Sequence, residues 1–405
     1  MALNTALSGI NAAQSDLNVI SNNISNANTT GFKGSRAEFA EIYAVTGINL
    51  NSTATGSGTR LVDVAQQFAQ GDIQTTNSSL DLAISGNGMF TLGDGKGVSY
   101  TRAGNFQTDA SNFVVTPSGA KLQVYPPNGI GGFDTSTLSP LQLVTAQSQA
   151  TPTSLVTMTS NLPAGASVPV NAFSPTDATS YNAATPVTVY DSLGGTHQGT
   201  VYYVKTATNA WNASLYVDGA SAGTQSMSFN TTGKLTSPAG GNLVFNPVPL
   251  GNGSNPLSLT VNVNNTTQFG TSYSAGAITQ NGFAAGTFSS IDIDSKGVVT
   301  AHYSNNQSSQ VGQIALANFA NLQGLNQLGN NNWTASGNSG SAVMGSAGGG
   351  QFGSVQSGAL ESSNTSDTTA QLVDMIKAQR NYQANAQVLG TDNTLASSLF
   401  AAVSR

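Results

Sequence analysis

Apolar residues recur at three- and four-residue steps in two long stretches, one at each end of the chain. Near the C-terminus the series contains Leu372, Met375, Tyr382, Ala386, Leu389, Ala396 and Phe400. Near the N-terminus it contains Leu3, Leu7, Ile10, Leu17, Ile20 and Ile24. This spacing is typical of a helix that packs one narrow stripe against a partner helix. The pattern therefore predicts helices over 1–24 and 366–405 that pair as a coiled coil.

Between these stretches the chain shows the alternation of apolar and polar residues that is typical of strands. Leu80, Leu82 and Ile84 alternate with other residues, and glycine-rich turn sequences follow. Residues 187–205 contain two runs of β-branched and aromatic residues around Gly194-Gly195, which is the pattern of a β-hairpin. We find no third long helical pattern, so the central part of the chain is predicted to be β-rich.

These patterns predict a multidomain, mainly β protein with two β domains, each sandwich- or barrel-like, nested between the paired terminal helices. The helical domain would comprise 1–24 and 366–405. A connecting segment would comprise 25–70 and 359–365. A discontinuous β domain would comprise 71–146 and 284–358, and an outer β domain 147–283.

Charged residues make up only 7% of the 405 residues, so the polar surface must consist mostly of amides and hydroxyls. A net charge of −6, with only 12 Lys and Arg, does not favour nucleic acid or an anionic membrane as a partner. The N-terminus lacks the basic and continuous apolar regions of a cleaved secretory signal. No apolar run approaches the roughly 18 residues of a membrane helix. We therefore expect no membrane insertion and, for an exported chain, a route without a cleaved signal.

Catalytic, cofactor-binding and metal-ligating patterns are not found in the sequence. The absence of cysteine excludes thiol chemistry and disulfides. The segment Asp292–Gly297 imitates the first half of a Ca²⁺ loop, but Lys296 and Tyr303 occupy positions where oxygen ligands are needed. We interpret it as a turn between strands. The sequence thus predicts no enzyme activity, no cofactor and no metal site.

The few charged and titratable side chains form one brief patch or lie at predicted turns. Lys33, Arg36, Glu38 and Glu41 form a brief charged patch that is more typical of a solvated face than of a site. Other groups of this kind fall at or beside predicted turns: Asp191, His197 and Asp218.

Several motifs in order along the chain resemble the signatures of the bacterial flagellar rod and hook family. They are Ser21–Lys33, Leu80–Phe90, Tyr100–Phe106 with Asp109, Gly358–Asn364, and Leu372–Ala386. Residues 147–283 resemble the outer domain of the hook members, which distal rod members lack. Departures from the family pattern at Thr365, Gln371, Met89 and Ser111-Asn112 lie outside the apolar stripes.

The resemblance implies a structural subunit of the flagellar hook that polymerises into a bendable helical tube and transmits torque from rod to filament. It implies an extracellular location, reached through the flagellar type III export apparatus. The implied partners are further copies of the chain, the hook cap, the distal rod and the hook–filament junction proteins. We expect the terminal helices to carry assembly through twelve residues, here called the assembly residues: Leu3, Leu7, Ile10, Leu17, Ile20, Ile24, Leu372, Met375, Ile376, Tyr382, Ala386 and Leu389.

Two alternatives remain at the level of sequence. A flagellar distal rod protein would share the terminal motifs, but the extra residues 147–283 argue against it. A secreted β-rich adhesin or enzyme would need a pocket with convergent polar groups and would not need helical ends.

Overall fold

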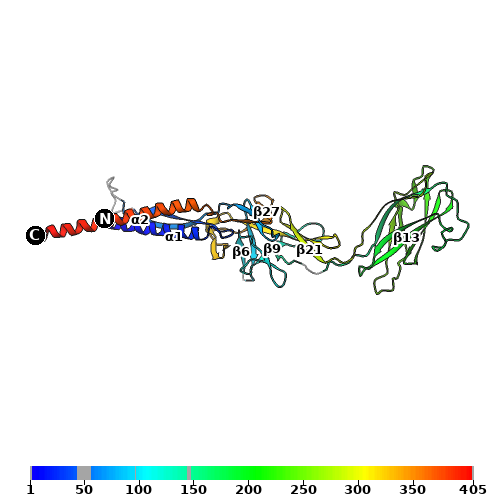
Figure 1. Cartoon of the computed structure of the whole chain (residues 1–405), viewed down its shortest axis with the longest axis horizontal. Helices are drawn as coiled ribbons and strands as arrows, with labels where there is room; N and C mark the ends of the chain where they lie inside the picture. Colours follow the sequence, from blue (N-terminus) through cyan, green and yellow to red (C-terminus); the bar gives the residue numbers. More distant parts are fainter. Residues whose placement is uncertain (1, 43–55, 96, 144–146, 404–405) are drawn as a thin grey trace. The chain divides into compact units, whose positions relative to one another are not determined.

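The structure is a computed structural model that describes residues 2–42, 56–95, 97–143 and 147–403. The chain divides into two compact units, which are described separately. Unit 1 comprises Met1–Val144, Ser290–Ala301 and Ser308–Arg405. Unit 2 comprises Thr145–Ser289 and His302–Gln307. The prediction of a mainly β protein with a helix at each end is confirmed (Figure 1).

Two helices, α1 (Ala2–Ser25) and α2 (Thr368–Val403), form one end of unit 1. Figure 1 shows them side by side, α1 in blue and α2 in orange to red. The carboxylate of Asp367 accepts hydrogen bonds from the N–H groups of Thr369 (3.1 Å) and Ala370 (3.2 Å), which caps the start of α2. Neither described helix is long and apolar enough to cross a membrane.

The body of unit 1 is a twelve-stranded sheet with the central order β21-β22-β23-β9-β5-β6-β25-β24. Strands from both halves of the chain pair in it, because β23 lies against β9 and β5. One core packs Leu92 and Leu122 from the first half with Ile314 and Leu316 from the second. The strands of this sheet are β5 (Met89–Gly93), β6 (Val98–Thr101), β7 (Gln107–Thr108), β8 (Val114–Val115), β9 (Lys121–Tyr125), β10 (Ser139–Pro140), β21 (Phe288–Ile293), β22 (Val298–Tyr303), β23 (Ser308–Asn318), β24 (Asn326–Gly329), β25 (Asn332–Thr334) and β26 (Val343–Ser346).

Three two-stranded sheets connect this body to the helices. They pair β1 (Ser35–Glu41) with β2 (Thr59–Gln66), β3 (Ile73–Thr75) with β28 (Ala359–Glu361), and β4 (Leu82–Ser85) with β27 (Ser354–Ser357). The sequence patterns did not predict β1 and β2, because most of their side chains stay exposed or half-buried and the burial alternation is weak. The other two pairs again join distant parts of the chain.

Unit 2 contains two five-stranded sheets whose facing side chains form one core around Trp211, Tyr203 and Val261. The predicted hairpin at 187–205 is confirmed as β12 and β13, with Gly194 at a positive φ of 85° in the turn. Near the two ends of the long segment of this unit, Thr151 and Phe283 lie side by side and exchange two backbone hydrogen bonds of 3.0 and 2.9 Å. The strands are β11 (Leu155–Pro163), β12 (Ala183–Tyr190), β13 (Thr196–Ala207), β14 (Ala210–Val217), β15 (Ala220–Phe229), β16 (Leu235–Ser237), β17 (Asn242–Val244), β18 (Thr260–Asn262), β19 (Thr267–Phe269) and β20 (Ser274–Gln280).

Candidate functional site

The seam between α1 and α2 is built from small side chains. Asn23 donates a hydrogen bond of 3.4 Å to Gln371, and a Cβ on Gly9 would lie 2.5 Å from the side-chain oxygen of Asn385, so the helices run antiparallel. Ala6, Ala13 and Ile20 are buried on α1 at seven-residue spacing, and Ala378 is buried on α2. Alanine at three of these four positions, together with Gly9, allows the two backbones to approach closely.

The assembly residues lie mostly outside this seam. Ile20 is buried, and five are half-buried: Ile10, Leu17, Ile24, Met375 and Leu389. The other six are exposed: Leu3, Leu7, Leu372, Ile376, Tyr382 and Ala386. The sequence reasoning thus missed the alanine seam, although the spacing of Ala6, Ala13, Ile20 and Ala27 is the signal that marks it.

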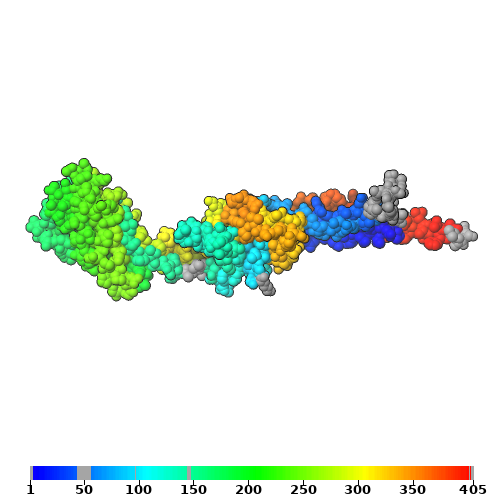
Figure 2. Space-filling model, turned by 180° about the vertical axis from the view of Figure 1, so that it is seen from behind, coloured from blue at the N-terminus to red at the C-terminus, as the bar shows by residue number. Residues whose placement is uncertain are grey.

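The last turns of α2 have no helical partner within the described chain. The register of the seam sets the start of α1 opposite the turn of α2 around Asp392, and Figure 2 shows α2 continuing beyond α1. In this extension Leu395, Leu399 and Phe400 are 69%, 67% and 75% exposed. Three large apolar side chains exposed to water within six residues are unfavourable in a free subunit and are typical of an interface.

A ribbon made of β1 and β2 lies along α1. The N–H of Thr59 donates to the hydroxyl of Ser8 over 3.2 Å, which ties the ribbon to the helix. Within the ribbon, Ala37 of β1 and Ala65 of β2 are buried. On the ribbon, several large apolar side chains remain exposed: Phe39, Leu61, Val62 and Val64.

Two asparagine side chains join the helices to the ribbon. The side chain of Asn23 accepts from the N–H of Ser35 (2.9 Å) and donates to its carbonyl oxygen (2.8 Å). Asn364 accepts from the N–H of Gly34 over 2.8 Å and donates to the carbonyl oxygen of Gln67. The segment that precedes α2 is therefore fastened to the segment that follows α1.

A buried cluster of three charged side chains also joins distant segments of the chain. It is here called the junction clasp and consists of Lys33, Arg102 and Glu361. The fully buried carboxylate of Glu361 accepts from Lys33 Nζ at 2.6 Å, from Arg102 Nε at 2.8 Å and from the N–H of Gly71 at 2.9 Å. Burial lowers the pKa of Lys33, and the Glu361 carboxylate opposes this shift. The interpretation of Lys33 as a solvated surface group is wrong, because it is only 2% exposed.

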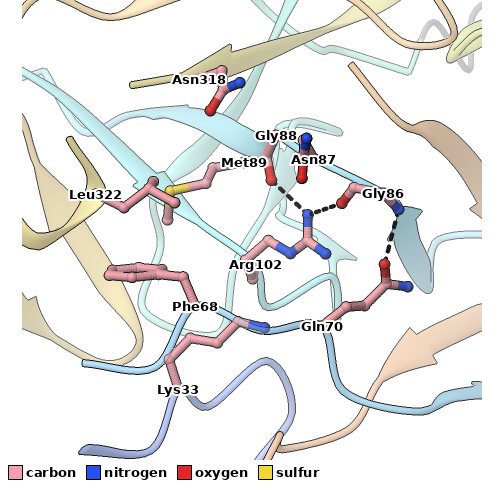
Figure 3. Close-up of a pocket in the computed structure, with 10 residues that line it drawn as sticks. All are labelled: Lys33, Phe68, Gln70, Gly86, Asn87, Gly88, Met89, Arg102, Asn318 and Leu322. Atoms are coloured by element: carbon pink, nitrogen blue, oxygen red, sulfur yellow. Dashed lines mark hydrogen bonds between the residues drawn. The ribbon is translucent and has the colours of Figure 1, made fainter. Parts of the chain in front are cut away.

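Arg102 also donates to three backbone carbonyl oxygens, those of Ile84, Gly86 and Gly88, at 3.2, 2.9 and 2.6 Å. Figure 3 shows its guanidinium directed at Gly86 and Gly88, with Lys33 below it, around a cavity of about 100 Å³. The clasp therefore joins five segments of the chain and includes one more positive than negative charge.

A groove runs between α1, β1 and α2. It has a volume of about 490 Å³, and Val19, Ile20 and Phe39 contribute apolar surface to it. Asp16 and Asp374 also line the groove. Burial and the charge of Asp374 raise the pKa of Asp16.

Within the described residues of unit 2, three titratable side chains gather at the turn of the predicted hairpin. The ring of His197 lies between the carboxylates of Asp218 (Nδ1 to Oδ2, 2.5 Å) and Asp191 (Nε2 to Oδ2, 3.1 Å). Its pKa is raised by the hydrogen bond to Asp218, against the effect of burial, with further contributions from Asp191. With both ring nitrogens facing carboxylates, the imidazolium form donates both hydrogen bonds.

The predicted Ca²⁺-like segment is a turn between β21 and β22. The carboxylate of Asp294 accepts from the N–H groups of Lys296 and Val298, each at 2.9 Å. Among the described residues, no group of three or more His, Asp or Glu side chains is placed to hold a metal ion.

The comparison with family models assigns this helical base, ribbon and discontinuous β core to the structural proteins of the bacterial flagellar axis. Four family models match the chain: "Flagella basal body rod protein" at residues 3–33, "Flagellar hook protein FlgE/F/G D1 domain" at 83–171, "Flagellar basal body protein FlaE D2 domain" at 161–283 and "Flagellar basal body rod FlgEFG protein C-terminal" at 356–401.

Curated relatives identify the family within this class. The flagellar hook protein FlgE of Escherichia coli (strain K12) is 38% identical over 98% of this chain and 99% of its own length. The hook proteins FlgE of Salmonella typhimurium and Borreliella burgdorferi are 37% and 30% identical over 98% and 97% of the chain, with 99% and 97% of their own lengths covered. The chain belongs to the flagellar hook protein family and is a structural subunit of the hook.

A solved structure shares the fold. The crystal structure of the Helicobacter pylori hook protein FlgE2 covers 70% of this chain and 99% of its own length, with a TM-score of 0.51 at 16% identity. The match of residues 161–283 to a hook-type domain and the near full-length relatives do not favour the rod alternative.

Proposed function

We propose that this chain polymerises through its terminal helices and ribbon into a bendable tube that joins the flagellar rod to the filament. The observation that carries the proposal is the exposed apolar surface of the helical base. Within the described residues it is contributed by α1, by the β1–β2 ribbon and by the unpartnered end of α2. Burial of this surface between copies would contribute roughly 25 cal/mol per Å² of apolar area.

The segments of the chain have distinct roles in the tube. Residues 1–24 and 366–405 line the tube, and the assembly residues form contacts between copies. Residues 25–70 and 359–365 connect the tube to a β domain formed by 71–146 and 284–358. Residues 147–283 form the outermost domain. Because the contacting faces differ, the interface is heterologous, and such contacts produce open helical assemblies rather than closed rings.

Bending requires neighbouring outer domains to slide past one another. Unit 2 contains only five charged side chains, of which Asp191 and Lys205 are buried, while Asp218 pairs with His197. A surface of amides and hydroxyls forms no strong ion pair that would hold one register. This supports low resistance to sliding in the outer layer.

The proposal extends to export and to further partners. The chain would pass unfolded through the flagellar type III apparatus without a cleaved signal and would assemble outside the cell beneath the hook cap. The distal rod and the hook–filament junction proteins would contact the two ends of the tube. Helices with an alanine seam and an exposed apolar stripe suit this sequence of events, because they are marginal alone and gain stability in the polymer.

The test uses the exposed leucines of α2. The double variant Leu395→Gln, Leu399→Gln should raise the critical concentration for tube formation at least about tenfold, since each loses about 1.5 kcal/mol or more of burial. The matched control is Ile130→Gln, Val170→Gln, which alters side chains that are 90% and 100% exposed outside the helical base. Sedimentation and electron microscopy measure the outcome. Equal polymerisation by the two double variants would refute the proposal.

A further inference from the structure

The groove between α1, β1 and α2 holds a carboxylate without a cation. Among the described residues, Asp16 has no hydrogen-bond or ion-pair partner. The two cations that line the groove are both engaged, since Lys377 Nζ lies 2.8 Å from Asp374 and an Arg36 guanidinium nitrogen lies 2.8 Å from Glu38. Asp16 is therefore the one carboxylate in the lining of the groove that has no paired cation among the described residues.

This charge is unfavourable in the free subunit. Asp16 is half-buried, and the nearby Asp374 carboxylate has the same sign. In a chain with only 7% charged residues, two carboxylates directed at one groove are unusual. Partial burial of a carboxylate beside another carboxylate is favourable only when a cation approaches.

A suitable cation lies on the far side of α2. Arg380 is exposed and has no ion-pair partner in the part of the chain that the structure describes. It stands nine residues, or two and a half helical turns, from Gln371, whose side chain contacts Asn23 of α1, so it faces away from α1. The register of the seam also sets it at nearly the same level along the helix pair as Asp16.

The geometry points to an ion pair between copies, in which Arg380 on α2 of one subunit enters the Asp16 groove of the next. This inference rests on the proposed polymerisation and adds the contact that sets its lateral register. The donor and the acceptor lie on different faces of the helix pair, so each subunit presents one of each and the contact can repeat without closing. The apolar walls of the groove, Val19 and Phe39, would cover the methylene groups of Arg380.

A charge swap tests the inference. Asp16→Arg and Arg380→Asp should each raise the critical concentration for tube formation on the order of five- to tenfold, the effect expected of a partly buried ion pair. The double variant Asp16→Arg, Arg380→Asp should return to within about twofold of the wild type, because the pair is restored in reverse. Circular dichroism and thermal unfolding of the monomers confirm that the subunits fold.

Two further sets of variants complete the experiment: neutral replacements of both charged residues, and a replacement of Arg60. The critical concentration of the wild type should rise with salt, and that of Asp16→Asn, Arg380→Gln should depend on salt less. Arg60 on the ribbon is the matched control, because it is also exposed. Rescue of Asp16→Arg by Arg60→Asp, or strictly additive losses in the charge swap, would overturn the assignment while leaving tube formation intact. Failure of the wild type to form tubes would overturn the proposed function as well.

Discussion

Replacement of Glu361 by glutamine tests the junction clasp with almost no change of shape. The variant retains an oxygen that can accept from Lys33 or Arg102, but it removes the carboxylate charge. Two cations, at most 7% exposed in their side chains, would then face only carbonyl and amide oxygens. The buried net charge would rise from one positive charge to two.

The expected loss of stability is large. Removing one partner from a buried, hydrogen-bonded ion pair costs about 3–5 kcal/mol, because the remaining charge is left uncompensated. For a unit of this size each kcal/mol lowers the midpoint of thermal unfolding by roughly 2–4 °C. The midpoint of unit 1 should therefore fall by roughly 6–20 °C.

Scanning calorimetry of the monomer measures this effect, with unit 2 as an internal reference. The matched control is Glu38→Gln, which removes the carboxylate of the exposed Arg36–Glu38 pair and should cost at most about 1 kcal/mol. A double variant, Lys33→Met with Glu361→Gln, restores the original buried net charge. We expect it to be more stable than Glu361→Gln alone, although Lys33 also loses its 2.7 Å bond to Ala69.

Two results would refute this reasoning. The first is a Glu361→Gln variant that unfolds within about 2 °C of the wild type, which would mean that water or a shifted backbone compensates the cations. The second is a double variant that is less stable than Glu361→Gln by the full cost of Lys33→Met. In that case the two residues contribute independently, and charge balance does not govern the junction.

Two further predictions concern unit 2 and the helix seam. Raising the pH from about 6 to about 9 should lower the midpoint of thermal unfolding of unit 2. The pKa of His197 is higher in the folded than in the unfolded protein, so its protonation stabilises the fold fully at a pH below the unfolded pKa of about 6.5. This stabilisation is lost as the pH rises through the folded pKa. His197→Gln should flatten this dependence, and an unchanged slope would contradict the assignment. Gly9→Val should overlap Asn385 and cost about 1–3 kcal/mol of helix pairing, measured by tube formation. Adding Asn385→Ala should restore tube formation. If it does not, overlap with Asn385 is not the cause of the loss.

The fold class could be predicted from the sequence because its signals are local. The two apolar stripes predicted α1 and α2, and the Gly194-Gly195 turn predicted the hairpin of unit 2. The turn that contains Asp294 could likewise be predicted from a segment of six residues. Each of these features depends on neighbours within a few positions.

The junction clasp could not be predicted in this way. Glu361 is 328 residues from Lys33 and 259 from Arg102, so only the folded chain brings the three together. Lys33 lies next to Arg36 and Glu38 in sequence, which made a surface patch the natural interpretation. The alanine seam was overlooked for a different reason: large side chains dominate a hydrophobic pattern, whereas close helix contact selects small ones.

The two backbone hydrogen bonds between Thr151 and Phe283 have a consequence for the evolution of such chains. Residues 151–283 begin and end at this one β-bridge, so the two ends of the stretch are adjacent in the folded chain. A domain with neighbouring termini can be exchanged at this point, and the entropy of closing the excursion grows only slowly with its length. Unit 1 is built entirely from residues outside this stretch, so selection can vary unit 2 while the sequence of unit 1 remains fixed.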